Sequence, residues 1–315
     1  MGRAGPRMEG SGTVYRSFTD AGPTGVPERW SGPQEAVEPR PGPDGVRRPD
    51  PGGRAGEGRA ADGAPPAVPW LPVVDGIPAA VEIRCLGGFR IAVRGVAVDC
   101  GAVRPKARSL LRLLALRAGT PVHRDALLDA LWPDLPHESG VRNLQVTVSR
   151  LRALLEPGTG RGSATLLVRD EHSYGLALGR RLTSDVREFD RWSAACLRPA
   201  HRWGTERRAA GLRAALHWYG GDLLPEEGSA EWVAEERRRL RGQAARLCAA
   251  LAGCELELGR ADASAAVAEH ALALDPYLDG AWRTLIAARE RVGDPAAAEN
   301  SRRAYARTLR ALGVA

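Results

Sequence analysis

Residues 142–155, RNLQVTVSRLRALL, constrain the fold more than any other stretch of the chain. Apolar side chains recur there at alternating spacings of three and four: Val141, Leu144, Val148, Leu151 and Leu155. That period is typical of an amphipathic helix that buries one side. The sequence therefore predicts a helix that packs its leucines and valines into a core.

The opposite face of this helix is polar and cationic. It carries two guanidinium groups, an amide, two hydroxyls and one valine: Arg142, Asn143, Val146, Thr147, Ser149 and Arg150. No acid occurs between Glu138 and Glu156, whereas a merely solvated helix usually mixes both signs. Arginine can bond guanine, asparagine can bond adenine, and a small apolar group can contact a thymine methyl. The face indicates either a DNA-binding surface or a surface helix that happens to be basic.

Positive charge is concentrated around this helix. Residues 81–180 hold 15 Lys and Arg side chains against nine Asp and Glu, whereas residues 1–80 carry one excess acid. A basic domain implies a polyanionic partner. The 315 residues are enough for two domains of ordinary size.

Several classes of chemistry are excluded. Lys106 is the only lysine and no GxxxxGK loop occurs, so a Walker-type nucleotide site is absent. The histidines and cysteines show no metal-ligand spacing, and no nucleophile motif is present. We expect a protein that is not an enzyme, with no catalytic residue, metal or cofactor. An odd count of five cysteines without CxxC indicates reduced thiols in the cytoplasm, and no apolar run is long enough for a membrane span.

The elements around the helix follow a recognisable order. Residues 81–100 alternate as a small antiparallel meander, and helices are predicted over 106–118 and 123–132. The segment 134–139, DLPHES, reads as a linker to the third helix. Residues 165–178, TLLVRDEHSYGLAL, predict two short strands with a turn near 170–173.

This order, together with RPKARSLLRLLALRAG, RDALLDALWPD and VRNLQVTVSRLRALLEPG, resembles the OmpR/PhoB-type winged-helix DNA-binding domain. The resemblance implies that the third helix enters the major groove. Its recognition positions fall here on Arg142, Asn143, Val146, Thr147, Ser149, Arg150 and Arg152. Arg152 lies nearer the buried stripe, where it would reach a phosphate or pack along the helix. Phosphate contacts, which position a domain without reading sequence, are expected from Arg104, Lys106 and Arg108.

The hairpin, or wing, departs from the family pattern. Relatives often carry an Arg- and Gly-bearing tip followed by GYRL, whereas this tip holds Asp170 and Glu171, and Gly175 replaces an arginine. Contact of the wing with DNA is therefore expected only from Arg169 or His172.

From Thr183 onward the chain reads as helices. Ser184 and Asp185 are candidates to cap the first of them. Gly259 and Gly293 are spaced by 34 residues, the period of tetratricopeptide repeats. The charged run 235–239 reads as a solvated helix face.

This half resembles the bacterial transcriptional activation domain. The matching segments are DVREFD, WYGGDLLPE, EWVAEERRRL, LALDPYLDGAWRTL and RRAYARTLRALGV. That domain follows an OmpR-like domain in the SARP family of activators (Streptomyces antibiotic regulatory proteins). The resemblance implies an activator of the small SARP type that binds direct repeats in promoter DNA, with a homodimer as one form on the repeats, and contacts RNA polymerase and its sigma factor.

The predicted architecture is α+β: a tail at 1–78, a winged helix at 79–180 and an all-α repeat domain at 183–315. The tail holds 14 of the 23 prolines and is expected to be disordered, so it cannot form a receiver domain. The function predicted is a sequence-specific DNA-binding activator associated with the nucleoid. The alternative is a helical-repeat interaction protein whose winged helix does not read DNA, which the acidic wing tip favours.

Overall fold

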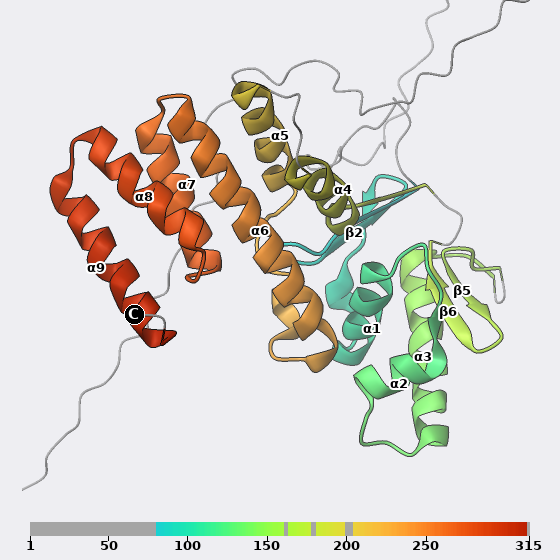
Figure 1. Ribbon diagram of the computed structural model, residues 1–315. Coiled ribbons are helices and arrows are strands. Elements are labelled where there is room, and N and C mark those ends of the chain that lie inside the picture. Colours follow the sequence, from blue (N-terminus) through green and yellow to red (C-terminus); the bar gives the residue numbers. More distant parts are fainter. Residues whose placement is uncertain (1–79, 161–162, 178–180, 199–203, 314–315) are drawn as a thin grey trace, which may run out of the picture. The chain divides into compact units, whose positions relative to one another are not determined.

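The computed structural model describes residues 80–160, 163–177, 181–198 and 204–313 (Figure 1). The predicted disordered tail, 1–78, lies outside these residues. In the described ranges no helix is both long and apolar enough to cross a membrane. Strands and three helices come first and a run of helices follows, so the predicted α+β class is confirmed.

The first sheet is the predicted meander with one added strand. In the order β3-β2-β1-β7, its strands are β3 (Val96–Ala97), β2 (Arg90–Val93), β1 (Val81–Arg84) and β7 (Leu182–Ser184). The meander strands pair antiparallel, whereas β7 runs parallel to β1. Ile83 and Ile91 are buried as predicted, but Glu82 and Ala92 between the predicted apolar positions are buried as well and Val96 is exposed, so the alternation holds only in part. β7 was not predicted because three residues, LTS, show no periodicity.

Three helices follow the meander in the chain and pack their leucines together: α1 (Pro105–Leu116), α2 (Arg124–Leu131) and α3 (His137–Leu155). Pro105 occupies the first helical position, where its missing N–H costs little. The prediction that 134–139 is only a linker is wrong, because α3 already begins at His137. Pro136 ends the extended segment, Glu138 favours the helix N-terminus, and the His137 ring lies 3.3 Å from the Asp125 carboxylate.

The predicted hairpin forms the wing. β5 (Leu167–Asp170) and β6 (Ser173–Leu176) pair antiparallel, and Glu171 takes a positive φ in the turn. β4 (Val122–His123) adds to the outer edge of β6. A strand of two residues directly before a helix gives no periodic signal, so the sequence did not predict β4.

The second half consists mainly of α-helices in its described residues, apart from β7 and the loop between α5 and α6. Its helices are α4 (Asp185–Leu197), α5 (Thr205–His217), α6 (Glu231–Glu257), α7 (Ala261–Leu274), α8 (Asp279–Val292) and α9 (Pro295–Ala311). Gly259 follows α6 and Gly293 follows α8, both with positive φ. The 34-residue spacing therefore marks two equivalent helix ends, and successive helices pack as antiparallel neighbours (Figure 1).

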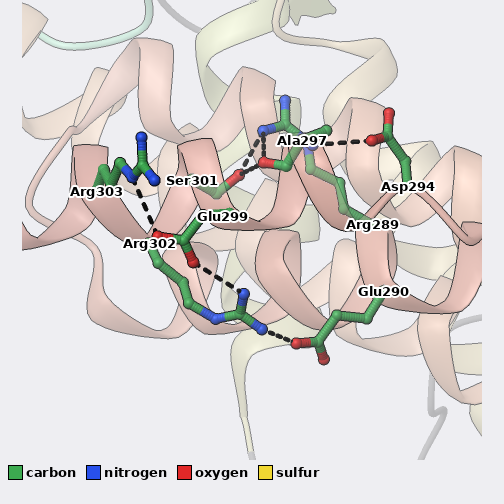
Figure 2. Close-up of polar contacts among 8 residues, drawn as sticks. All are labelled: Arg289, Glu290, Asp294, Ala297, Glu299, Ser301, Arg302 and Arg303. Carbon is green, nitrogen blue, oxygen red and sulfur yellow. Dashed lines mark hydrogen bonds and ion pairs between the residues drawn. The ribbon is translucent and has the colours of Figure 1, made fainter.

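Arg289 joins the last three helices through its guanidinium group. It donates to the carbonyl of Ala297 at 3.1 Å and to the hydroxyl of Ser301, both on α9, and pairs with Glu269 of α7 at 2.5 Å. Figure 2 shows the α8–α9 part of this cluster, where Arg302 also bridges Glu290 and Glu299. These contacts connect α8 to both α7 and α9.

A backbone contact joins the first sheet to the loop between α5 and α6. Beyond β1, the amide of Gly87 donates to Asp222 O at 3.0 Å and that of Leu224 donates to Cys85 O at 2.8 Å. Leu86 and Leu223 form a β-bridge between them. This approach needs glycine, because a Cβ on Gly87 would come within 2.6 Å of the carbonyl carbon of Gly220. A Cβ on Gly220 would in turn lie 2.9 Å from Leu86 O, and one on Gly221 3.1 Å from the Cα of Gly87, so the same close approach explains the GG of WYGGDLLPE.

Acidic side chains complete this junction. Asp185 is 3% exposed and accepts hydrogen bonds from the amides of Cys85 and Leu86, each at 2.8 Å, as well as from Val186. The prediction that Ser184 and Asp185 cap α4 is wrong for Ser184, which occupies the N-cap position but makes no capping hydrogen bond; Asp185 is the first residue of the helix and accepts from only one amide of it. Glu227 pairs with Arg112 of α1 at 2.7 Å and accepts from Ser109.

The expectation of a solvated face at 235–239 is wrong for Arg237, which is half-buried, whereas Arg239 is exposed as expected but is engaged in an ion pair. Arg237 donates to the carbonyls of Leu223, Gly228 and Leu224 at 2.8, 2.6 and 2.8 Å, so it holds the loop against α6. Arg239 pairs with Asp190 of α4 at 2.8 Å. Both side chains stabilise the helical half.

Gly87→Ala should destabilise the protein more than Gly95→Ala does. Both residues have a positive φ, of 78° and 79°, but nothing lies within 4 Å of a Cβ on Gly95. The shared backbone strain cancels, which leaves an overpacking cost of about 1–3 kcal/mol at Gly87. Urea unfolding of the two variants measures the difference, and equal losses would show that the Gly87–Gly220 approach is not required.

The carboxyl group of Asp185 should titrate near pH 6. Burial raises its pKa from 3.8 to about 6, although the amides of Leu86, Cys85 and Val186 favour the charged form. The folded state therefore binds a proton more tightly than the unfolded state. This contribution to stability is present below pH 4 and is lost as the pH rises through 6. Carboxyl carbon NMR, assigned with Asp185→Asn, measures the midpoint; a midpoint below 4 would contradict the burial argument.

Candidate nucleic-acid interface

Helix α3 is divided into a buried and an exposed side as the period predicts. Leu144, Val148, Leu151 and Leu155 are at most 3% exposed and contact the leucines of α1 and α2. On the opposite side the exposed residues are Arg142, Asn143, Val146, Ser149 and Arg150. The structure therefore brings five of the seven predicted recognition residues onto one accessible face.

The polar groups of this face differ in whether they already form hydrogen bonds within the protein. Arg142 lies 3.4 Å from the hydroxyl of Ser139, a weak contact, and Arg150 makes no hydrogen bond or ion pair with any described residue. Thr147 is half-buried, and its hydroxyl donates to Asn143 O at 2.7 Å. The two exposed guanidinium groups can therefore reach an external acceptor with little rearrangement, whereas Thr147 is partly committed to its own helix.

Arg152 lies on the side of α3 that faces the wing. Its Nε donates to Leu167 O of β5 at 2.8 Å, and the side chain is half-buried. At the end of α3, Glu156 accepts from the amides of Thr165 and Leu166 at 2.8 and 2.9 Å. Partial burial opposes ionisation of Glu156, but the hydrogen bonds from Leu166 and Thr165 outweigh it and lower its pKa. Both residues therefore fix the wing to the helix, and α3 and the wing lie side by side in Figure 1.

The predicted phosphate contacts lie near the start of α1. Arg104 and Lys106 are exposed and Arg108 is half-buried. The ammonium group of Lys106 donates to Leu131 O at the end of α2, 2.6 Å away. This bond was not predicted; it satisfies a carbonyl that the helix itself leaves open.

The wing tip is acidic and accessible. Asp170, Glu171 and His172 are all exposed, and Arg169 folds back so that its Nε donates to Glu171 O at 3.1 Å. The tip therefore presents two carboxylates beside one partly engaged guanidinium group.

Gln145 is an exposed residue of α3 that the sequence reasoning did not select. At about 100° per residue it lies on the flank toward Arg152 and the wing. Its amide can donate and accept, as a base edge requires. The helical period alone could have found it, because it lies as far from the buried stripe as Thr147 does.

The described part of the chain shows little sign of a metal site or a nucleophilic cysteine. No cluster of three or more His, Cys, Asp or Glu side chains there could hold a metal ion. The Cys85 thiol is buried, and this burial, with a further contribution from the negative charge of Asp185, raises its pKa well above its usual value, which disfavours the reactive thiolate.

Comparison with known proteins identifies both halves of the chain. Residues 100–171 match the model described as "Transcriptional regulatory protein, C terminal", and residues 184–315 match "Bacterial transcriptional activator domain". The chain is 28% identical over 207 residues to MoaR1 of Mycobacterium bovis, covering 66% of each protein. It is 28% identical over 221 residues to DnrI of Streptomyces peucetius, covering 68% of this chain and 79% of DnrI.

EmbR of Mycobacterium tuberculosis is similar in both sequence and structure. The sequences are 29% identical over 208 residues, 66% of this chain and 53% of EmbR. A solved structure of EmbR with a low-affinity phosphopeptide gives a TM-score of 0.62 at 27% identity, over 73% of this chain and 60% of that one. The chain thus spans about half to two thirds of the length of EmbR and MoaR1.

Arg152→Ala should lower stability whereas Arg150→Ala should not. The first change removes a bond to Leu167 O and the packing of the side-chain stem, at a cost of about 1–2 kcal/mol. Arg150, two residues away, is exposed, so its loss should change the free energy of unfolding by less than about 0.5 kcal/mol. Urea unfolding of the pair measures this. Equal effects would mean that Arg152 does not hold the wing.

Proposed function

Because the chain belongs to the SARP-type transcriptional regulators, we propose that it binds promoter DNA through α3 and activates transcription. The observation that carries this proposal is the exposed face of α3. It joins two arginines, an asparagine, a serine and a valine on a surface with no acid between Glu138 and Glu156. In the family the C-terminal regulatory domain is combined with an activator domain, as it is here.

The shape and chemistry of α3 suit the major groove of DNA. A groove about 12 Å wide admits one helix, and its base edges offer acceptors to arginine and a methyl group to valine. Base readout is assigned to Arg142, Asn143, Val146, Ser149 and Arg150, with Thr147 at the margin. Arg152 contributes by holding the wing, with any phosphate contact secondary to that role.

Phosphate contacts would set the position of the domain without reading sequence. Arg104, Lys106 and Arg108 supply them near the start of α1. Lys106 has three ammonium protons, of which the bond to Leu131 O uses one. The carboxylates of the wing tip are repelled by the DNA backbone, so Arg169 or His172 is the wing residue left for a phosphate.

The helical domain α4–α9 is proposed as the surface that recruits RNA polymerase through its sigma factor. Stacked helices present a broad surface for a protein partner. One winged helix reads few base pairs, so binding to direct repeats by two copies would supply the missing specificity. The protein would act at chromosomal promoters in the cytoplasm, by binding rather than by catalysis.

A second candidate is a helical-repeat interaction protein whose winged helix does not read DNA. The exposed Asp170 and Glu171 at the wing tip favour it. Footprinting on genomic fragments at physiological salt separates the two functions. A protected direct repeat supports the activator, whereas binding that disappears with salt and protects no defined site supports the interaction protein.

Arg150→Ala and Arg104→Ala should weaken DNA binding in different ways. The first should cost roughly 1–3 kcal/mol at one base position and relax the preference there. The second should weaken all sequences alike and reduce the salt slope by about one. Arg104 is a cleaner phosphate test than Lys106, whose loss would also remove the bond to Leu131 O.

In vitro selection and fluorescence anisotropy at several salt concentrations measure both effects. If either variant bound selected and random duplexes as the unaltered protein does, the role given to that arginine would be wrong.

A further inference from the structure

The α8–α9 pair is joined by polar contacts at one end and hollowed at the other. Near the turn between the two helices, Arg289 and Arg302 bind acceptors across the pair (Figure 2). The helices are antiparallel neighbours, so the start of α8 lies beside the end of α9. There the surface has a hollow of about 350 Å³. Its lining includes Tyr277, Trp282, Ala304, Arg307 and Ala311.

The Trp282 ring forms a fixed wall of this hollow. Its Nε1 donates to Pro276 O at 2.9 Å, and the ring stacks on that of Tyr305 with the centroids 5.8 Å apart. The hydroxyl of Tyr305 in turn donates to the carboxylate of Asp279. Because the indole ring is held at one edge and one face, binding an apolar group against it would order little of the protein that is not already ordered.

Tyr277 adds an exposed ring to the same hollow. It is 59% exposed, more than any other large apolar residue that the structure describes. Its amide donates to Asp275 Oδ1 at 3.0 Å, which fixes the loop before α8 and leaves the ring uncovered. On α9, Ala304 and Ala311 line the hollow with short side chains, which leave room for a partner's side chain. Exposed aromatic residues beside such a space are typical anchors of protein interfaces.

Arg307 supplies a positive charge to the hollow. It is exposed and makes no hydrogen bond or ion pair with any described residue. Between positions 300 and 313 the chain holds four arginines and no acid. The two acids of the opposite segment are already engaged, Asp275 with a backbone amide and Asp279 with Arg283 at 3.0 Å. A guanidinium group beside an apolar wall suits a carboxylate that neighbours an apolar group.

The hollow suits a segment of a protein better than a small free ligand. Small-ligand sites bury most of the surface of their ligand, whereas Tyr277, Arg307 and Ala311 are all exposed here. The positive charge also continues past the hollow, because Arg303 and Arg310 lie about one helical turn to either side of Arg307. A small ligand would contact Arg307 alone, whereas a segment that lies along α9 can contact all three arginines.

We propose that this hollow binds an acidic segment of a partner protein. An apolar side chain of the segment packs against Trp282 and Tyr277, and a neighbouring carboxylate pairs with Arg307. Further acids of the segment lie near Arg303 and Arg310. This inference rests on the recruiting role proposed for the helical domain, and it names the place on that domain and the chemistry of the segment that binds there.

Selection of short random peptides against the full chain at physiological salt tests the proposal. The recovered peptides should share an apolar residue next to Asp or Glu. The tightest of them, labelled with a fluorophore, is then the probe for anisotropy titrations. The indole N–H resonance of Trp282, assigned with Trp282→Phe, should shift when this peptide is added.

Charge variants connect the peptide to Arg307. Arg307→Glu should weaken binding at least about tenfold, because an ion pair becomes a repulsion. Arg238→Glu is the matched control, because Arg238 is exposed on α6 and its replacement changes the net charge equally. It should leave the affinity unchanged.

Variants of the aromatic rim test the apolar contact. Tyr277→Ala should weaken binding about fivefold or more, as removal of an aromatic anchor usually does, whereas Tyr277→Phe keeps the ring and should bind normally. Val292→Ala is the control, because Val292 is 46% exposed at the other end of α8. All these positions are exposed, and thermal unfolding followed by circular dichroism checks that each variant is folded.

The outcomes separate this inference from the function on which it rests. Recovery of no peptide above background, or of peptides without acids, overturns the peptide site. A selected peptide that binds Arg307→Glu and Tyr277→Ala as tightly as the unaltered protein overturns it too. The assay contains neither DNA nor RNA polymerase, so these results leave the proposed regulator in place, whereas a failed promoter footprint overturns the regulator and leaves the peptide site in place.

Discussion

The burial of one side of α3 determines what the other side can do. Leu144, Val148, Leu151 and Leu155 pack against α1 and α2, and this packing fixes the rotation of the helix about its own axis. Arg142 and Arg150 then face solvent, because the helical period places them on the side opposite the buried residues. Arg152 and Glu156, on the flank and at the end, fasten the wing beside the same helix. The candidate interface thus depends on apolar side chains that are buried in the core and would not contact a partner themselves.

Backbone contacts and buried acidic side chains link the first sheet to the helical half. Gly87 approaches Gly220 so closely that no side chain fits, while Asp185 and Glu227 accept hydrogen bonds from the first sheet and from α1. Arg237 holds the intervening loop through three carbonyl groups. A DNA-binding module and an activation module joined in this way share contacts beyond the chain that connects them, so events at one can affect the stability of the other.

Hydrophobic periodicity predicted the long, regular elements correctly. It did not predict structure that depends on a few residues and their contacts with distant parts of the chain. The sequence predicted the buried stripe of α3, the wing and the 34-residue repeat, because each extends over several helical turns or a full hairpin. β4 and β7 are too short to show a period, and α3 starts earlier than predicted because His137 meets Asp125 across two helices. Arg237 looked solvated because its acceptors lie 9 to 14 residues away, in a loop whose path the sequence does not reveal. Gln145 was not predicted as an exposed residue of the recognition face, although the helical period of α3 places it there.

The claim that α3 reads base edges in the major groove is tested most directly by dimethyl sulfate protection of a selected duplex. This reagent methylates guanine N7, which lies in the major groove and is the atom that arginine bonds. The account predicts strong protection of two guanines in the bound duplex, with protection of one of them lost in Arg142→Ala and of the other in Arg150→Ala. A tight, specific complex in which every guanine N7 stays fully reactive would contradict it.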